Sequence, residues 1–372
     1  MNRRFCLLGS FPGTVVTLRG DLTREIMQRG YEATVLTAAP EANIEADIKA
    51  LDVDFQAYHV ERNAMSVRSD LRTLLELRRY FVDSRPDIAL AYTVKPIIWG
   101  GIASRHVRHT RFFAMITGIG YAFQGGGLKR RLLSMLVTRL YRYALRRAEG
   151  VIFQNPENRD LFIRKKIVDP QKCHVVNGSG VNTKHFKEHS FVDEEPRFLL
   201  IARLLGEKGI REYIAAAEIV KQVYPRTQFD LVGPEDPSTD GIPFSEVESW
   251  HKSGVIKYRG PTSDPRPFLR ECHIYVLPSY HEGVPRTVLE AMCTGRPILT
   301  TDVVGCRETV IDGQNGWLVP KADAQALAER MLWFIEHREQ WQAMGEASRK
   351  LAEERFDVVK VNEQMLKIMG IT

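Results

Sequence analysis

Residues 182–203, NTKHFKEHSFVDEEPRFLLIAR, pass from a polar stretch straight into a short apolar run. The polar part covers residues 182–196, and the run RFLLIAR that follows it is typical of a buried strand. Similar runs, alternating with helical patterns, occur on both sides of the polar stretch. The sequence therefore predicts two domains that join near residue 190.

The alternation of strands and helices predicts a parallel sheet in each domain. Before the division, β-branched or aromatic runs occupy residues 3–9, 32–38, 53–60, 87–93, 111–116, 150–154 and 173–176. After it, they occupy residues 197–203, 228–233, 254–260, 273–279 and 297–302. The stretches between them, such as SDLRTLLELRRYFVDS at 69–84, carry apolar residues at helical spacing.

We therefore expect an α/β protein of two Rossmann-like, doubly wound domains facing a central cleft. The N-terminal domain spans residues 1–190 and the C-terminal domain spans residues 191–372. The last helix, at about 356–370, is a candidate to pack back on the N-terminal domain.

Length and composition agree with this division. A chain of 372 residues exceeds the size at which one hydrophobic core stops growing, and 44% hydrophobic with 26% charged residues excludes a disordered chain.

The five cysteines are scattered and never spaced C-x-x-C, which argues against a disulfide framework or a zinc site. No stretch reaches eighteen apolar residues, and the first apolar run is too short for a signal peptide. We expect a cytoplasmic protein.

The net charge of +6 is distributed unevenly. Residues 1–190 carry 30 lysines and arginines against 18 acidic residues, a net +12, and the remainder carries 22 against 28, a net −6. A basic half predicts an anionic surface or ligand, which could be phospholipid, nucleic acid or a phosphorylated substrate.

The ends of the predicted strands are the places to look for ligands, because open α/β sheets bind them there. After the first strand, Gly9 and Gly13 can let the backbone approach a phosphate at a helix start. The pattern is not G-x-G-x-x-G and lacks the acidic residue of a nicotinamide enzyme. A plain glycine–proline turn is the alternative interpretation.

After the first strand of the second domain, ARLLGEKGI places Arg203 at the strand end and Lys208 just before a helix. A guanidinium binds a phosphate bidentately and an ammonium adds a point charge, so the pair suits a diphosphate. The alternative is that both cations are simply exposed to water.

Residues 279–297, SYHEGVPRTVLEAMCTGRP, place a turn of Gly283, Val284 and Pro285 before an apolar helix. Proline is favoured at the first helical position, so we expect Pro285 there. The peptide N–H groups after the turn would then point toward an anion.

Two glutamates flank this turn. Glu282 precedes it in the loop, and Glu290 lies more than one turn into the helix, so the two need not touch. Carboxylates repel phosphate, so we expect hydroxyl partners: those of a sugar for Glu282 and those of a ribose for Glu290. A favourable interaction with the helix dipole would explain Glu290 alone.

The motifs R-x4-K at 203–208 and E-x7-E at 282–290, within LPSYHEGVPRTVLEAMCTGRPILTTDVVGCRETVIDGQNGWLVP, resemble the retaining glycosyltransferases of family 4, which have the GT-B architecture. The N-terminal stretches LRGDL, AYTVKPIIWGGIASR and AMITGIGYAF resemble the branch that adds hexosamines or hexoses to polyprenyl-diphosphate-linked sugars. That branch assembles bacterial capsule, O-antigen and glycans.

The resemblance implies a role for each matching residue. Arg203 and Lys208 would bind the diphosphate of a nucleotide-sugar donor, Glu282 the transferred sugar and Glu290 the ribose. Gly13 would contact the phosphates from the other domain. The donor would be UDP-linked.

One feature departs from the family. Many members carry a histidine in the N-terminal domain that contacts the donor sugar, whereas this chain has Val94 and Lys95 at that place. Lys95 and Thr117 are the candidates to assist the acceptor.

The chemistry so implied needs neither a protein nucleophile nor a metal. The leaving diphosphate can accept the acceptor's proton, and stabilising that leaving group is the main task. A metal-dependent GT-A enzyme would need a D-x-D motif, which Asp52 and Asp54 offer only superficially, since they lie in a predicted turn and strand. We expect no metal and no other cofactor.

Residues 128–147, LKRRLLSMLVTRLYRYALRR, carry seven basic and no acidic residues, with apolar residues at helical spacing. A buried apolar stripe with arginines in water is the structural interpretation. The outer face would still attract an anionic membrane, through Lys129, Arg130 and Arg131. We therefore expect a peripheral protein on the inner face of the cell membrane.

Three other classes fit less well. A nucleic-acid binder would explain the basic half, but the chain shows no aromatic platform or helix-turn-helix signature, so we expect no nucleic-acid partner. A catalytically silent GT-B scaffold would not need the four motif residues. A UDP-sugar epimerase of the same architecture would turn over its nucleotide sugar without an acceptor.

Overall fold

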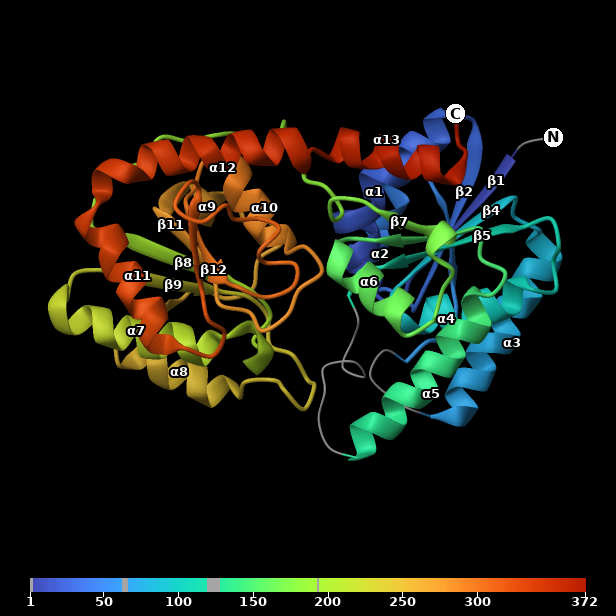
Figure 1. Cartoon of the computed structure of the whole chain (residues 1–372), viewed down its shortest axis with the longest axis horizontal. Coiled ribbons are helices and arrows are strands. Elements are labelled where there is room, and N and C mark those ends of the chain that lie inside the picture. The colour runs from blue at the N-terminus through green and yellow to red at the C-terminus, as the bar shows by residue number, and fades with distance from the viewer. Residues whose placement is uncertain (1–2, 62–65, 119–127, 193) are drawn as a thin grey trace. The chain divides into compact units, whose positions relative to one another are not determined.

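The computed structural model describes residues 3–61, 66–118, 128–192 and 194–372, except the side chains of Asn43 and residues 128–130 (Figure 1). The chain divides into two compact units. Unit 1 comprises Met1–Ser179 with Val359–Thr372, and unit 2 comprises Gly180–Val358. The division thus falls earlier than residue 190, and the C-terminal segment belongs to unit 1.

Unit 1 is built on a seven-stranded sheet in the order β3-β2-β1-β4-β5-β6-β7. Its strands are β1 (Arg3–Leu8), β2 (Tyr31–Thr37), β3 (Asp54–Ala57), β4 (Ile88–Tyr92), β5 (Arg111–Ile116), β6 (Gly150–Phe153) and β7 (Cys173–Val175). All neighbours pair in parallel. The strand order reverses between β1 and β4, which makes this pair the topological switch point.

Helices cover both faces of this sheet (Figure 1). They are α1 (Gly13–Gln28), α2 (Ala42–Lys49), α3 (Val67–Ser84), α4 (Val94–Ser104), α5 (Leu128–Leu145), α6 (Pro156–Arg164) and α13 (Val358–Met369). Cys6 and Leu8 of β1 share a buried cluster with α3 to α6, whereas Phe5 and Leu7 share one with α1, α2 and α13. This alternation is the period of two expected for a strand buried on both faces.

Unit 2 repeats the plan with a six-stranded parallel sheet in the order β10-β9-β8-β11-β12-β13. Its strands are β8 (Arg197–Ile201), β9 (Gln228–Val232), β10 (Lys257–Tyr258), β11 (Ile274–Leu277), β12 (Ile298–Thr301) and β13 (Gly316–Val319). Its helices are α7 (Ile210–Val223), α8 (Phe244–Lys252), α9 (Arg266–Glu271), α10 (Arg286–Cys293), α11 (Ala324–Glu336) and α12 (Trp341–Arg355). Here β8 and β11 form the switch point.

The prediction of an α/β, doubly wound fold is confirmed in both units. Each predicted strand is present, although β10 keeps only two residues of the predicted run at 254–260. Strand β13 was not predicted. Among the described residues, none of the helices combines the length and apolar character needed to cross a membrane.

Candidate functional site

The switch point of unit 2 brings together a lysine and a glutamate that the sequence singled out separately. Lys208 follows β8, and Glu282 follows the adjacent strand β11. The Lys208 Nζ lies 2.5 Å from the Glu282 Oε1, and each side chain is only 15% exposed. The R-x4-K and E-x7-E motifs therefore meet at one carboxyl-end edge of the sheet.

The loop after β8 is fastened to the end of β11 by close backbone packing. Gly209 has a φ of +70°, and a Cβ there would overlap the carbonyl oxygen of Pro278. The carbonyl of Glu207 accepts hydrogen bonds from the Tyr280 amide at 2.8 Å and the Ser279 hydroxyl at 3.2 Å. Since only glycine fits this contact without strain, it fixes the backbone next to Lys208.

Arg203, also after β8, has a carboxylate partner that the sequence analysis did not find. Its Nη1 donates to the Oδ2 of Asp236, a buried side chain in the loop after β9. Burial raises the pKa of Asp236, but hydrogen bonds from Ser238 and the charge of Arg203 outweigh it and hold the pKa below its ordinary value. The only sequence signal for Asp236 was its place just after the predicted strand at 228–233.

The turn before α10 packs on the loop after β12. The Glu282 amide donates to the Val304 carbonyl at 3.1 Å, and a Cβ at Gly305 would overlap the Gly283 carbonyl. Val284 and Pro285 complete the turn. Pro285 is the N-cap of α10 and not its first helical residue, because its ψ of 115° is still extended. The prediction for Pro285 was therefore wrong by one position.

Glu290 is buried within α10 and has its own cation. Its Oε1 accepts from the Arg286 Nε at 2.9 Å, while the Arg286 Nη1 donates to the Gly180 carbonyl at 2.8 Å. Burial raises the pKa of Glu290 above its ordinary value, although Arg286 acts in the opposite direction. Arg286 was missed in the sequence, where its spacing of four residues from Glu290 was the available signal.

Two candidates of unit 1 follow the two strands of its switch point. Gly13 is the first residue of α1, after β1, and Lys95 is the second residue of α4, after β4. A Cβ at Gly13 would lie 3.2 Å from the Phe11 ring and 3.8 Å from a methyl group of Ile44. The Lys95 Nζ lies 2.8 Å from the Asp70 Oδ1 of α3.

Backbone strain marks the same edge. Thr93, between β4 and α4, has a φ of +66° and a ψ of 161°, which is unfavourable for a β-branched residue. Its hydroxyl lies 2.9 Å from the Ser10 hydroxyl after β1. Thr117 is half-buried in the loop after β5. The loops after β1, β4 and β5 therefore place polar side chains at neighbouring strand ends.

The remaining sequence candidates lie elsewhere. The side chains of Lys129 and Arg130 lie outside the described residues, and Arg131 is exposed on α5. Asp52 lies in the turn after α2 and Asp54 begins β3, at the amino end of that strand. Across the described ranges, no three His, Cys, Asp or Glu side chains are grouped so that they could hold a metal ion.

Family models match both units. The model "Glycosyl transferases group 1" matches residues 181–351, and the model "Glycosyl transferase 4-like domain" matches residues 13–178. Together they span most of the chain, which therefore belongs to the glycosyltransferases with this pair of domains. Its two Rossmann-like units are those of the GT-B architecture.

Individual relatives agree with this assignment. A Campylobacter jejuni protein, N,N'-diacetylbacillosaminyl-diphospho-undecaprenol alpha-1,3-N-acetylgalactosaminyltransferase, is 27% identical, with 90% of this chain and 89% of that protein covered. The Escherichia coli UDP-Gal:alpha-D-GlcNAc-diphosphoundecaprenol alpha-1,3-galactosyltransferase is 24% identical, with 76% and 75% covered. The crystal structure of Anabaena Alr3699/HepE in complex with UDP superposes with a TM-score of 0.81 at 20% identity, covering 100% of both chains.

Proposed function

We propose that this glycosyltransferase moves a hexosamine or hexose from a UDP-linked donor to a polyprenyl-diphosphate-linked saccharide, with retention and without a metal ion. The observation that carries the proposal is the contact between Lys208 and Glu282 at the switch point, with Arg203 on the same strand end. A switch point is where doubly wound sheets bind nucleotides.

The donor would be held by residues of unit 2. Arg203 and Lys208 offer a guanidinium and an ammonium to the diphosphate. The backbone of Gly283, Val284 and Pro285 leads into α10, whose N-terminal amides receive no side-chain cap from Pro285. These groups suit the phosphates of a nucleotide sugar.

The carboxylates would recognise hydroxyl groups. Glu282 has its free oxygen for the transferred sugar while Lys208 holds the other. Arg286 holds Glu290 in place for the ribose. The name of the E. coli relative, which uses UDP-Gal, supports a UDP-linked donor.

The acceptor would be recognised by unit 1. Lys95 and Thr117 are the residues we assign to the acceptor, and Gly13 to the phosphates. Both relatives are named for undecaprenyl-diphosphate-linked acceptors, which supports the same acceptor class here. We assign the reaction to capsule or O-antigen biosynthesis.

The reaction balances without a protein nucleophile. The bond between the anomeric carbon and the diphosphate oxygen breaks, and a bond to the acceptor oxygen forms on the same face. The acceptor proton passes to the departing diphosphate. Arg203 and Lys208 stabilise the charge that develops on this leaving group.

The reaction would take place at the cytoplasmic face of the cell membrane, where a polyprenyl acceptor is anchored. Arg131 is exposed on the basic helix α5, and Lys129 and Arg130 precede it. Basic side chains near an anionic bilayer are attracted to its surface electrostatically. The protein would therefore be peripheral, with these three residues at the membrane.

The test has two stages. A screen of nucleotide sugars for thermal stabilisation identifies the donor, because a ligand at 100 times its Kd adds about 2.7 kcal/mol. The stabilising donor is then incubated with an undecaprenyl-diphosphate-linked sugar, and the anomeric configuration of the product is read by NMR. An α-linked product from an α-linked donor supports the proposal.

The same assay examines the two alternatives. An epimerase would convert the nucleotide sugar without acceptor, and a catalytically silent scaffold would bind it without any turnover. A β-linked product would contradict retention alone.

A further inference from the structure

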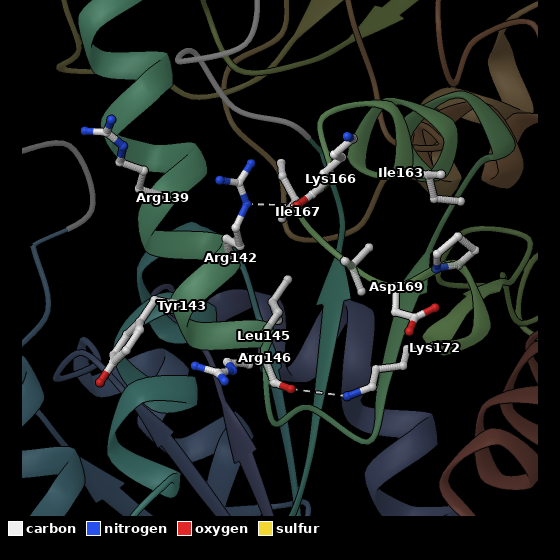
Figure 2. Close-up of a pocket in the computed structure, with 12 residues that line it drawn as sticks. Arg139, Arg142, Tyr143, Leu145, Arg146, Ile163, Lys166, Ile167, Asp169 and Lys172 are labelled. Atoms are coloured by element: carbon white, nitrogen blue, oxygen red, sulfur yellow. Dashed lines mark hydrogen bonds between the residues drawn. The ribbon is translucent and has the colours of Figure 1, made fainter.

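Unit 1 contains a cationic cavity at the edge of its sheet opposite to Gly13 and Lys95. Helices α5 and α6 line it together with the loop 165–172, and it has a volume of about 830 Å³ (Figure 2). Helix α5 precedes β6, and the loop 165–172 precedes β7. The cavity therefore lies near the residues where these two strands begin. Nothing in the proposed transfer uses this edge.

The lining is strongly basic. Its cations are Arg139, Arg142, Arg146, Lys166 and Lys172, and its single acidic residue is Asp169 (Figure 2). The Asp169 carboxylate accepts a hydrogen bond from the Gln171 amide at 3.0 Å. Within the described residues, it forms no salt bridge with any of these five cations. An anionic ligand is therefore complementary to the cavity.

Two of the cations fix the shape of the cavity. The Arg142 guanidinium donates to the carbonyls of Lys166 at 2.8 Å and Lys165 at 3.0 Å, which ties the loop to α5. The Lys172 Nζ donates to the carbonyls of Ala148 at 2.9 Å and Arg146 at 3.3 Å. Figure 2 shows one hydrogen bond of each tie as a dashed line, from Arg142 to the Lys166 carbonyl and from Lys172 to the Arg146 carbonyl. The walls are thus held in place by the protein itself.

The other three cations remain available to a ligand. Arg139, Arg146 and Lys166 are exposed, and none forms a salt bridge with another described residue. They come from two different segments, α5 and the loop after α6, and Figure 2 shows their charged groups extending in different directions. Their combined charge attracts a phosphate to the cavity.

Apart from Tyr143, the remaining lining is apolar. Leu145, Ile167 and Val168 are buried at the cavity, and Ile163 and Pro170 add to it. A ligand that matches both parts carries a phosphate and an apolar group together.

The outer stripe of α5 extends this pattern along the helix. Leu132, Met135 and Leu136 are 55%, 52% and 55% exposed, and spacings of three and four residues align them with Arg139 and Arg146. A helix that lies in a membrane interface likewise combines cations for the headgroups with exposed apolar side chains for the acyl chains.

We propose that this cavity binds the phosphate headgroup of an anionic phospholipid while the apolar stripe of α5 contacts the bilayer. The inference deepens the membrane contact proposed above and rests on it. It adds a discrete headgroup site to a general attraction between a basic surface and anionic lipid.

The test compares two variants that lose the same charge. Arg139→Gln with Arg146→Gln removes two available cations of the cavity. Lys360→Gln with Lys367→Gln removes two exposed cations of α13, which covers the opposite face of the sheet. Sedimentation measures binding to vesicles of phosphatidylcholine with phosphatidylglycerol, and to phosphatidylcholine alone.

We expect the cavity variant to bind the mixed vesicles at least about tenfold more weakly, since each cation near an anionic surface contributes about fivefold. The α13 variant should lose less than about threefold, because its cations are remote from that surface. Equal losses in both variants, or no loss in the cavity variant, would overturn the headgroup site. Unchanged melting temperatures confirm that both variants are folded.

A soluble competitor distinguishes lipid from free phosphate. Glycerol phosphate and inorganic phosphate should not displace the protein from mixed vesicles at millimolar concentration, because they lack the apolar group. Displacement by either one, lost in the cavity variant, would mean that the site takes a soluble phosphate, which overturns the assignment to lipid.

The triple variant Lys129→Ser, Arg130→Ser and Arg131→Ser separates this inference from the contact proposed earlier. If only the triple variant loses vesicle binding, the headgroup site is overturned and the earlier contact stands. If the cavity variant loses binding, the inference is supported even where the triple variant has no effect. Donor-induced thermal stabilisation should be unchanged in both.

Discussion

At the scale of single residues, the candidate donor site pairs each cation with a carboxylate. Lys208 pairs with Glu282, and Arg203 pairs with Asp236. Such pairs keep the two cations in fixed positions, so a diphosphate meets them already oriented. Preoriented charge is what makes electrostatic stabilisation of a leaving group effective.

We expect Lys208→Ala to lower kcat about 100- to 1000-fold, because one well-placed donor stabilises a transition state by about 3 to 4 kcal/mol. The free energy of unfolding should fall by no more than about 2 kcal/mol, since Glu282 loses a partner but keeps some contact with water. Steady-state kinetics and urea unfolding measure the two quantities. Arg211→Ala, which breaks the more exposed pair with Glu246, is the matched control. Unchanged turnover of the Lys208 variant would refute its role at the diphosphate.

Glu290 leads to a prediction about pH. Its pKa is raised in the folded protein, so the folded state holds that proton more tightly than the unfolded state does. The stability contributed by the protonated carboxyl is fully present below the unfolded pKa of about 4.3 and is lost as pH rises through the folded pKa. Glutamine carries no titrating proton. The wild type should therefore lose stability relative to Glu290→Gln as pH increases.

Urea unfolding of both proteins at several pH values between 4 and 8 measures this difference. A difference that stays constant, or one that grows in favour of the wild type with rising pH, would contradict the raised pKa.

At the scale of elements, the positions of the strands were easier to predict from the sequence than the side-chain contacts between the loops that follow them. The buried strands at 197–203 and 273–279 were predictable because both faces are covered, which leaves continuous apolar runs. Strand β13 was missed because GWLV has four residues and its glycine is not typical of a strand. The start of α10 was misplaced by one residue, since proline is compatible with both the N-cap and the first turn.

The candidate site was predictable only where spacing along the chain carries the signal. Lys208 and Glu282 each follow a strand end, so their motifs identified them separately. Their contact depends on β8 and β11 being neighbours, which no local pattern specifies. Asp236 lies on a third loop and reaches Arg203 only because β9 borders β8. The cationic cavity likewise requires α5 and the loop after α6 to be adjacent in space.

At the scale of the whole molecule, the charge asymmetry follows the two units. Unit 1, as the structure bounds it, carries 30 basic against 18 acidic residues, and unit 2 carries 22 against 28. A net negative unit would repel a diphosphate at long range, so binding there must depend on cations at short range. Arg203 and Lys208 supply these. The excess charge of unit 1 is instead available to an anionic surface.

This distribution bears on metal dependence. In a metal-dependent transferase, a divalent cation neutralises the diphosphate and is held by carboxylates. Here Arg203 lies just after β8, and Lys208 lies at the end of the turn that follows this strand. These two side chains can provide the positive charge themselves. We therefore expect transfer to an undecaprenyl-diphosphate-linked acceptor to survive an excess of EDTA with less than about a twofold change in kcat. Detergent-solubilised acceptor is the substrate of choice, because chelation also alters the divalent cations bound to anionic bilayers. Complete loss of transfer, restored by magnesium or manganese, would show that a metal ion and not the pair Arg203 and Lys208 balances the charge of the leaving group.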